Sequence, residues 1–221
     1  MRLGCLSLLF ALVLMLVLPW VFADILATAL VKLRLSPNTA GLLVFGIFGG
    51  SLINIPVKRI ARTEAVRVDP FVVLHGLWPQ LRRTHAETIV AVNVGGCVIP
   101  AGLAIYEVLT IAAHPHALGG LAAATLVNVA VCYKVAWPVE GVGIVIPAPL
   151  PAAVACAIAL LMAPSDATPI AFVAGVAGPL VGADLLHLRE IERSASGMVS
   201  IGGAGTFDGI LLSGILALYL A

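Results

Sequence analysis

Charged side chains are scarce in this sequence of 221 residues. They make up 10% of the chain, whereas hydrophobic residues make up 61% and the mean hydropathy is +1.12. A typical soluble domain has about a quarter of its residues charged. The net charge of +1 also excludes the concentrated basic surface that a nucleic-acid backbone requires. We therefore predict an integral membrane protein whose main partner is the lipid bilayer, with no nucleic-acid partner.

Paired cysteines are also lacking. The four cysteines fall singly inside apolar runs, without the spacing of a zinc site or of a secreted disulfide framework. We expect them to be reduced packing residues, and we expect no metal and no cofactor. No fixed-period repeat and no soluble segment of domain length are present, which favours a single transmembrane domain over residues 1–221.

Apolar runs of membrane-crossing length are what the sequence does contain. They predict an all-α, polytopic transmembrane helix bundle with about seven spans. The runs cover about 3–31, 38–55, 88–112, 117–135, 142–163, 169–188 and 197–220.

The first run has two interpretations. Residues 2–23 have the layout of a signal peptide cleaved before Asp24. The apolar stretch resumes after Asp24 and continues to Val31, so we favour an uncleaved first helix with a kink or break at Pro19.

Basic residues set the predicted orientation. With a cytoplasmic N-terminus, ten Lys and Arg residues fall on the inner side and only Lys32 and Arg34 on the outer side. This bias predicts a multi-pass protein of the cell membrane (the inner or plasma membrane) with its N-terminus in the cytoplasm. In the basic cytoplasmic loop 56–87, apolar residues recur at helical spacing over 71–83. This pattern is typical of a helix lying in the membrane interface, and a soluble loop is the alternative.

The fifth run carries Pro147, Pro149 and Pro151, which cannot continue a regular helix. We expect this span to be broken by the prolines. Non-helical backbone at membrane depth is tolerated where it lines a cavity, so a substrate cleft beside these prolines is one hypothesis. A kinked helix whose free carbonyls are satisfied by neighbours is the other.

Asp184 and Asp208 are the main catalytic candidates, because charged groups inside spans are costly and usually functional. If the last two spans form an antiparallel hairpin with a turn at 194–197, the two carboxyls lie at one depth. Two close carboxyls in a low-dielectric site share a proton and can act as general acid and general base. An ionised Asp would activate water while the protonated Asp assists the carbonyl oxygen of a peptide.

Other polar groups are predicted to share the same cytoplasmic half of the membrane and to line a common pocket. Each asparagine could instead bond a neighbouring helix, and His187 could be an interface histidine. Gly203 and Gly205 would let an extended peptide approach the backbone. Glu107 lies toward an outer helix end, where we expect it to snorkel to water without a catalytic role. The predicted cavity residues are Asn54, Asn93, Asn128, Pro147, Pro149, Pro151, His187, Gly203 and Gly205.

Two resemblances follow from these motifs. Paired Asp residues on consecutive helices resemble presenilin and signal peptide peptidase, the intramembrane aspartyl proteases. The second motif of that family ends Gly-x-Gly-Asp, and this chain reads Gly203-Ala-Gly205-Thr-Phe-Asp208. A Pro-Ala-Leu motif of the same family is similar to Pro147-Ala-Pro-Leu150. This resemblance implies peptide-bond hydrolysis by Asp184 and Asp208.

The second resemblance extends over the whole chain. The phrases Gly50-Ser-Leu-Ile-Asn-Ile-Pro56, Val92-Asn-Val-Gly-Gly96 and Gly202-Gly-Ala-Gly-Thr-Phe-Asp-Gly209 resemble a family of predicted prokaryotic multi-pass membrane proteins of unknown function. That family, domain of unknown function family 1614, implies a membrane protein and supplies no activity.

Three hypotheses remain open from the sequence. The first is an intramembrane aspartyl protease that cuts membrane-protein or peptide substrates with Asp184 and Asp208. The second is a transporter or channel in which Asp184, His187 and Asp208 relay protons. The third is a non-catalytic structural membrane protein whose glycine-rich faces pack helices together.

Overall fold

The computed structural model describes residues 3–61, 87–139, 143–147, 149–190 and 197–221. The predicted interfacial helix over 71–83 lies outside these ranges, as does most of the predicted turn at 194–197. In chain order the elements are α1 (Leu3–Val31), α2 (Pro37–Gly50), β1 (Asn54–Ala61), β2 (Glu87–Asn93), the π-helix η1 (Val94–Val98), α5 (Ile99–Ala112), α6 (Pro115–Val135), β3 (Trp137–Val139), β4 (Gly143–Val145), α7 (Pro149–Met162), the 3₁₀ turn η2 (Pro164–Asp166), α8 (Ala167–Ala177), the π-helix η3 (Gly178–Leu185), β5 (Gly197–Ile201), the 3₁₀ turn η4 (Gly205–Phe207) and α10 (Gly209–Leu220).

The chain is mostly helical, and the helices are compatible with a lipid bilayer. Within the described residues, three helical stretches are long and apolar enough to cross a membrane, judged by length and composition: Val94–Ala112, Pro115–Val135 and Pro164–Leu185. Three shorter apolar helices cover Val17–Val31, Pro149–Met162 and Gly209–Leu220. The predicted count of seven spans is therefore not confirmed.

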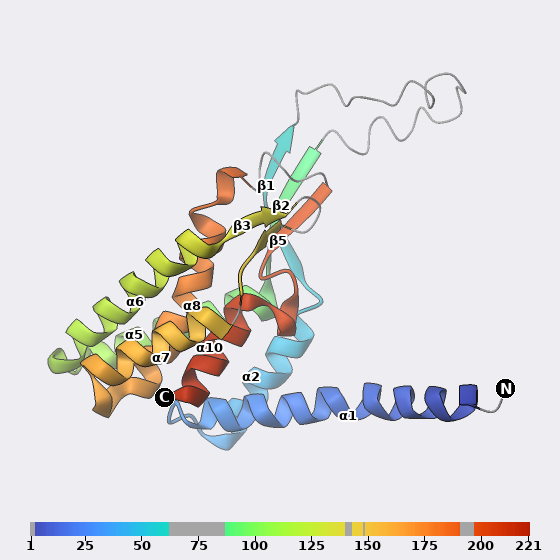
Figure 1. Ribbon diagram of the computed structural model, residues 1–221, viewed down its shortest axis with the longest axis horizontal. Helices are drawn as coiled ribbons and strands as arrows, with labels where there is room; N and C mark the ends of the chain where they lie inside the picture. Colours follow the sequence, from blue (N-terminus) through green and yellow to red (C-terminus); the bar gives the residue numbers. More distant parts are fainter. Residues whose placement is uncertain (1–2, 62–86, 140–142, 148, 191–196) are drawn as a thin grey trace.

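The prediction of a helical protein is confirmed in its coarser form, because the chain is mostly helical, but two small sheets also stand at one end of the helices (Figure 1). Four of the apolar runs that were expected to be spans contain a strand: 38–55 enters β1, 88–112 begins with β2, 142–163 begins with β4, and 197–220 begins with β5. β2 is rich in β-branched residues, which favour strands. A hydropathy window counts apolar residues and not their period, so a strand joined to a short helix looks like one span.

The larger sheet has the order β1-β2-β5. β1 and β2 run antiparallel, with Asn54 opposite Asn93, and β2 and β5 run parallel, with Val92 opposite Ile201. The smaller sheet pairs β3 with β4. This register brings the start of β1 and the ends of β2 and β5 together next to the helices, and the candidate site lies there.

The prolines lie at other places than expected. Helix α1 continues through Pro19, so the predicted break there is absent. Pro147 precedes α7 and Pro149 is its first residue, where a missing amide donor costs nothing. The prolines thus mark the start of a helix, and a break within a span is not confirmed.

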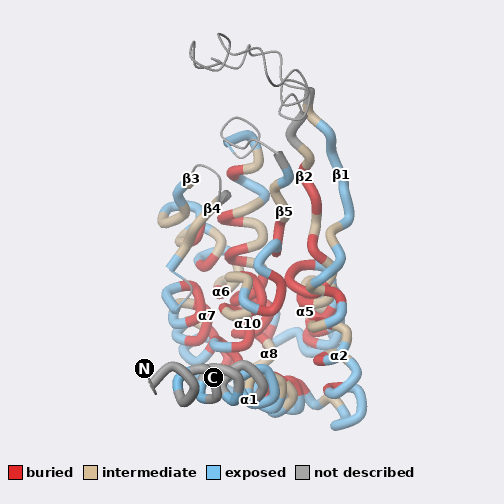
Figure 2. Tube along the Cα trace, turned by 90° about the vertical axis from the view of Figure 1, so that its right-hand side faces the viewer, coloured by how far each residue is buried: buried red, intermediate tan, exposed pale blue. Residues whose placement is uncertain are grey.

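Helix α8 is the centre of the helical layer and packs against α5, α6, α7 and α10. All of its residues from Ile170 to Val176 are buried, and Figure 2 shows the buried chain concentrated among these helices. Gly175 permits the close approach of α10, because a Cβ there would lie 2.9 Å from the Ser213 carbonyl oxygen. This packing fixes α8 and, with it, the η3 segment that follows.

Candidate functional site

A cavity of about 460 Å³ lies where η3, β4, β5 and the start of α10 meet, and we name it the carboxyl cavity. Both predicted catalytic aspartates line it. Its lining residues are Asn54, Ile144, Val145, Ile146, Pro179, Ala183, Asp184, Met198, Val199, Ser200, Ile201, Gly202, Gly203, Ala204, Asp208, Gly209 and Ile210.

The two carboxyls reach the carboxyl cavity from different elements. Asp184 lies in the π-helical turn η3, and Asp208 is the N-cap of α10. The Asp208 carboxylate accepts hydrogen bonds from the amide of Ile210 at 2.9 Å and from the amide of Ala204 at 3.4 Å. Both carboxyls line the same cavity, and no Lys or Arg is among its lining residues. The predicted helical hairpin is wrong in detail, because β5 and η4 precede α10, yet both side chains face one cavity.

A hydrogen-bond network between three chain segments forms one side of the site. The buried Asn93 side chain donates to the Ser51 carbonyl oxygen at 2.8 Å and to Oδ1 of Asn54 at 3.1 Å. Its own Oδ1 accepts from the Gly96 amide at 2.8 Å, which caps η1. Ser200 completes the network by donating to Asn54 Oδ1 at 2.6 Å. Asn54 and Ser200 thereby present fixed polar groups to the carboxyl cavity.

The glycines before Asp208 hold the loop that carries it. Gly202 and Gly205 have positive φ angles of 71° and 62°, a conformation that side chains with a Cβ rarely adopt. A Cβ on Gly96 would overlap the carbonyl oxygens of Gly202 and Gly205, so the two turns touch through their backbones. This contact places Asp208 at a defined position over η1.

His187 and Asn128 do not line the carboxyl cavity. The His187 ring is buried, its Nδ1 lies 2.9 Å from the Ala183 carbonyl oxygen, and it packs on Tyr133 at 4.8 Å between ring centroids. Asn128 donates to the Ala174 carbonyl oxygen at 2.7 Å and so joins α6 to α8. Both predictions of a cavity position were wrong, and both side chains have helix-packing roles.

The proline segment lies beside the carboxyl cavity without lining it. Pro147 and Pro149 are exposed and Pro151 is buried in α7, whereas the residues just before them, Ile144 to Ile146, form one wall. Of the two predicted glycines, Gly203 lines the carboxyl cavity and Gly205 packs on Ser51. Asn93 is not among the lining residues, but its side chain donates a hydrogen bond to Asn54, which lines the carboxyl cavity.

Sequence reasoning missed Ser200 and Cys97. Ser200 bonds Asn54, and only the pairing of β5 with β2 could have indicated this. Cys97 is buried beside the glycine loop, where a Cβ on Gly202 would lie 2.7 Å from the Cys97 Cβ. Among the described residues, no group of three or more His, Cys, Asp or Glu side chains could hold a metal ion.

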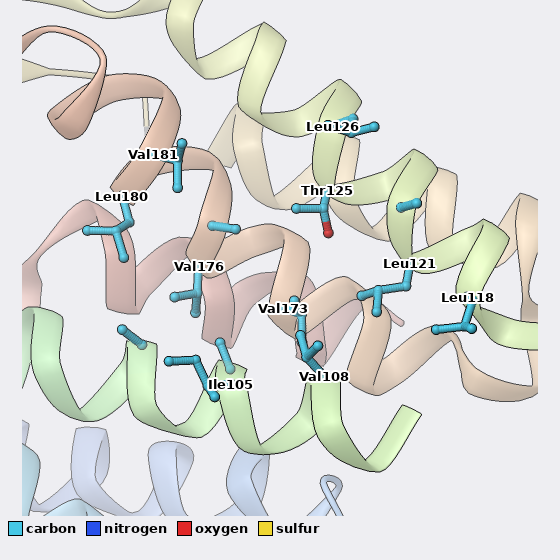
Figure 3. Close-up of a pocket in the computed structure, with 14 residues that line it drawn as sticks. Ile105, Val108, Leu118, Leu121, Thr125, Leu126, Val173, Val176, Leu180 and Val181 are labelled. Carbon is cyan, nitrogen blue, oxygen red and sulfur yellow. The ribbon is translucent and has the colours of Figure 1, made fainter. Parts of the chain in front are cut away.

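A second, larger depression of about 670 Å³ runs between α5, α6 and α8, and we name it the apolar groove (Figure 3). Side chains such as Ile105, Val108, Leu121 and Val176 line it, and it contains no titratable group. The Thr125 hydroxyl is buried there without a hydrogen-bond partner. The apolar lining of this groove suits contact with hydrocarbon chains.

Known proteins supply a family for this chain and no activity. No curated protein and no solved structure matches the chain, and the resemblance to presenilin and signal peptide peptidase is not supported. A family model with the description "Protein of unknown function (DUF1614)" matches residues 48–220, which include every strand and both aspartates. The chain therefore belongs to the DUF1614 family.

Proposed function

We propose that this protein is an intramembrane aspartyl hydrolase that cuts peptide substrates with Asp184 and Asp208. The observation that carries the proposal is that two carboxyls from separate elements line one cavity that has no Lys or Arg in its lining. Such a pair holds a proton between its members more readily than it ionises completely.

The chemistry follows from that shared proton. The ionised carboxyl takes a proton from a water molecule as its oxygen attacks the peptide carbonyl carbon. The protonated carboxyl gives its proton to the carbonyl oxygen, which forms a neutral diol. Collapse of the diol breaks the C–N bond, with proton transfer to the leaving amine. Asp208 accepts two amide hydrogen bonds, which favour its charged form, so we assign it the role of base and Asp184 the role of acid.

The free edge of β5 supports an extended substrate. β5 pairs with β2 on one side, and no described strand pairs with its other side. Met198 to Ile201 line the carboxyl cavity, so the cavity lies beside backbone groups that can bind another strand. Gly203, which also lines the cavity, leaves room for the substrate backbone next to Asp208.

The orientation is part of the proposal. The bias of Lys and Arg residues supports a cytoplasmic N-terminus in the cell membrane. The β1-β2 pair flanks the basic segment 62–86, so the same bias supports a carboxyl cavity that opens on the cytoplasmic side.

The relay hypothesis has less support from the geometry. His187 was expected to link the two aspartates, but its Nδ1 faces carbonyl oxygens of its own helix turn. We therefore do not propose proton transport as a second function.

The test is proteolysis by the full-length protein in liposomes, with a library of apolar peptides as substrate and mass spectrometry as readout. Asp184→Asn and Asp208→Asn should each abolish cleavage. Asparagine also caps helices well, so Asp208→Asn keeps the α10 cap and isolates the loss of the acid. The control is Asp24→Asn, at an exposed position of α1. Cleavage that survives either site substitution, or no cleavage by the wild type across the library, would overturn the proposal.

A further inference from the structure

A small polar cavity of about 70 Å³ lies at the end of α5 that is farther from the sheet, and we name it the Glu107 pocket. It holds the buried Glu107 side chain, which is 3% exposed and whose Oε1 atom has no hydrogen-bond partner. The expectation that Glu107 snorkels to water was therefore wrong. The lining residues are Lys32, Leu33, Arg34, Tyr106, Glu107, Thr110, Ile111, His114, Asp166 and Pro169.

Two cations and a second carboxyl accompany Glu107, and the second carboxyl, Asp166, already has a partner in His116 Nε2 at 3.2 Å. Lys32 Nζ donates to the carbonyl oxygens of Leu218 and Tyr219, at 3.4 and 3.3 Å, and so is held at the C-terminus of α10. Arg34 has a φ angle of 61° and lines the same pocket as Glu107. No ion pair within 4.0 Å joins Arg34 to Glu107 among the described residues.

The charged residues that line the Glu107 pocket suit a ligand with a cationic end and an anionic end. A buried carboxylate oxygen without a donor is costly, and a group with N–H donors and a positive charge would satisfy it. Lys32 and Arg34 suit an anionic group at the pocket mouth, and both residues are exposed. The pocket lies where α5 ends and α6 begins, which is where an apolar helix layer meets lipid headgroups.

We propose that the Glu107 pocket binds the phosphoethanolamine headgroup of a zwitterionic phospholipid, with the ammonium at Glu107 and the phosphate between Lys32 and Arg34. The pocket has room for a few water molecules, which suits a primary ammonium on a short chain. A choline headgroup has no N–H donor for Oε1, and a glycerol headgroup has no cation. The proposal depends on the membrane environment and not on the aspartate pair.

The test is native mass spectrometry of the full-length protein in detergent with phosphatidylethanolamine, phosphatidylcholine and phosphatidylglycerol of identical acyl chains. We expect phosphatidylethanolamine to bind roughly tenfold more tightly than phosphatidylcholine, the size of one charge-assisted hydrogen bond. Equal binding of the three lipids would overturn the proposal.

Two variants separate the ends of the headgroup. Glu107→Gln removes the charge at the ammonium end, so the preference over phosphatidylcholine should fall to about equality. Arg34→Gln should weaken binding of both lipids by the same factor and leave the preference intact. Retention of the full preference in Glu107→Gln would contradict the assignment.

A methylation series and a soluble competitor complete the test. Wild-type protein should bind N-methyl, N,N-dimethyl and trimethyl forms of the lipid progressively less well. This series tests the ammonium site with wild-type protein alone, so it holds even if Glu107→Gln fails to fold. Free phosphoethanolamine that displaces the lipid at equal concentration would assign the pocket to the soluble compound, with the same chemistry. Binding that does not depend on methylation would overturn the proposal.

Discussion

The carboxyl cavity contains two half-buried aspartates and the Glu107 pocket contains a buried glutamate, and the charged residues around these acids differ. In the carboxyl cavity Asp184 faces a second carboxyl, and no Lys or Arg is among the lining residues. In the Glu107 pocket the acid has Lys32 and Arg34 beside it. Like charges without a counter-ion favour a shared proton and acid-base chemistry, whereas mixed charges favour binding of a zwitterion. We therefore propose different roles for the carboxyl groups of the two sites, because their neighbours differ.

The largest expected effect comes from giving the carboxyl cavity the charge pattern of the Glu107 pocket. Met198 lines the cavity and is 61% exposed, so Met198→Lys can place an ammonium beside the aspartates without disturbing the core. A cation there stabilises both carboxylates, and the pair loses its shared proton. We expect peptide cleavage in liposomes to slow by about 10² to 10⁴-fold, the contribution of general acid-base catalysis.

The matched control for this change is Met198→Gln, which has a similar shape and no charge. The loss in Met198→Lys is to be measured against the Gln variant, with thermal unfolding recorded for both. If the two variants cleave equally fast, the proton shared by Asp184 and Asp208 has no part in the reaction.

The next effect concerns backbone packing at the two ends of the helices. A Cβ on Gly96 would overlap backbone oxygens of the glycine loop, and nothing lies within 4 Å of a Cβ on Gly119 in α6. We expect Gly96→Ala to lower the free energy of unfolding by about 1–3 kcal/mol or more, as overpacking does. Gly119→Ala should raise it by up to about 1 kcal/mol, because alanine favours helix.

Thermal unfolding of both alanine variants in one detergent measures this difference. The Gly96→Ala variant should also lose cleavage, since the loop it displaces carries Asp208. Equal stability of the two variants would show that the turns of η1 and η4 do not depend on contact between their backbones.

The sequence predicted part of this arrangement, and the particular residues show why. Asp184 and Asp208 were identified because a charge in an apolar run is costly wherever the chain goes, and the structure puts both in one cavity. Asn54 and Gly203, two of the predicted cavity residues, are among the lining residues of this cavity. His187 was assigned from helical spacing, but rotation of a side chain about its helix is set by packing, here against Tyr133.

The sheet could not be predicted from hydropathy. β2 and β5 are short apolar strands that continue into helices, and their pairing joins residues more than a hundred positions apart in the chain. The Glu107 pocket was missed for a related reason. From sequence alone, an acidic residue near a helix end is predicted to be exposed. Glu107 is buried because the chain around Lys32 and Arg34 packs next to it.

The smallest expected effect concerns Thr125 in the apolar groove. Unlike the acids of the other two sites, Thr125 is a polar residue with no charged residue in the lining around it. Its hydroxyl lacks a hydrogen-bond partner, as Glu107 Oε1 does, but the groove around it is apolar and offers no binding pattern. Thr125→Val replaces the hydroxyl by a methyl group of similar size. We expect stability to change by less than about 1 kcal/mol, toward stabilisation, because an unsatisfied polar group is removed. Thermal unfolding in detergent measures this change, and cleavage and the phosphatidylethanolamine preference should both stay at the wild-type level. A marked loss of either would mean that the Thr125 hydroxyl has a ligand of its own, and an unpartnered oxygen would then mark a binding site even without charge beside it.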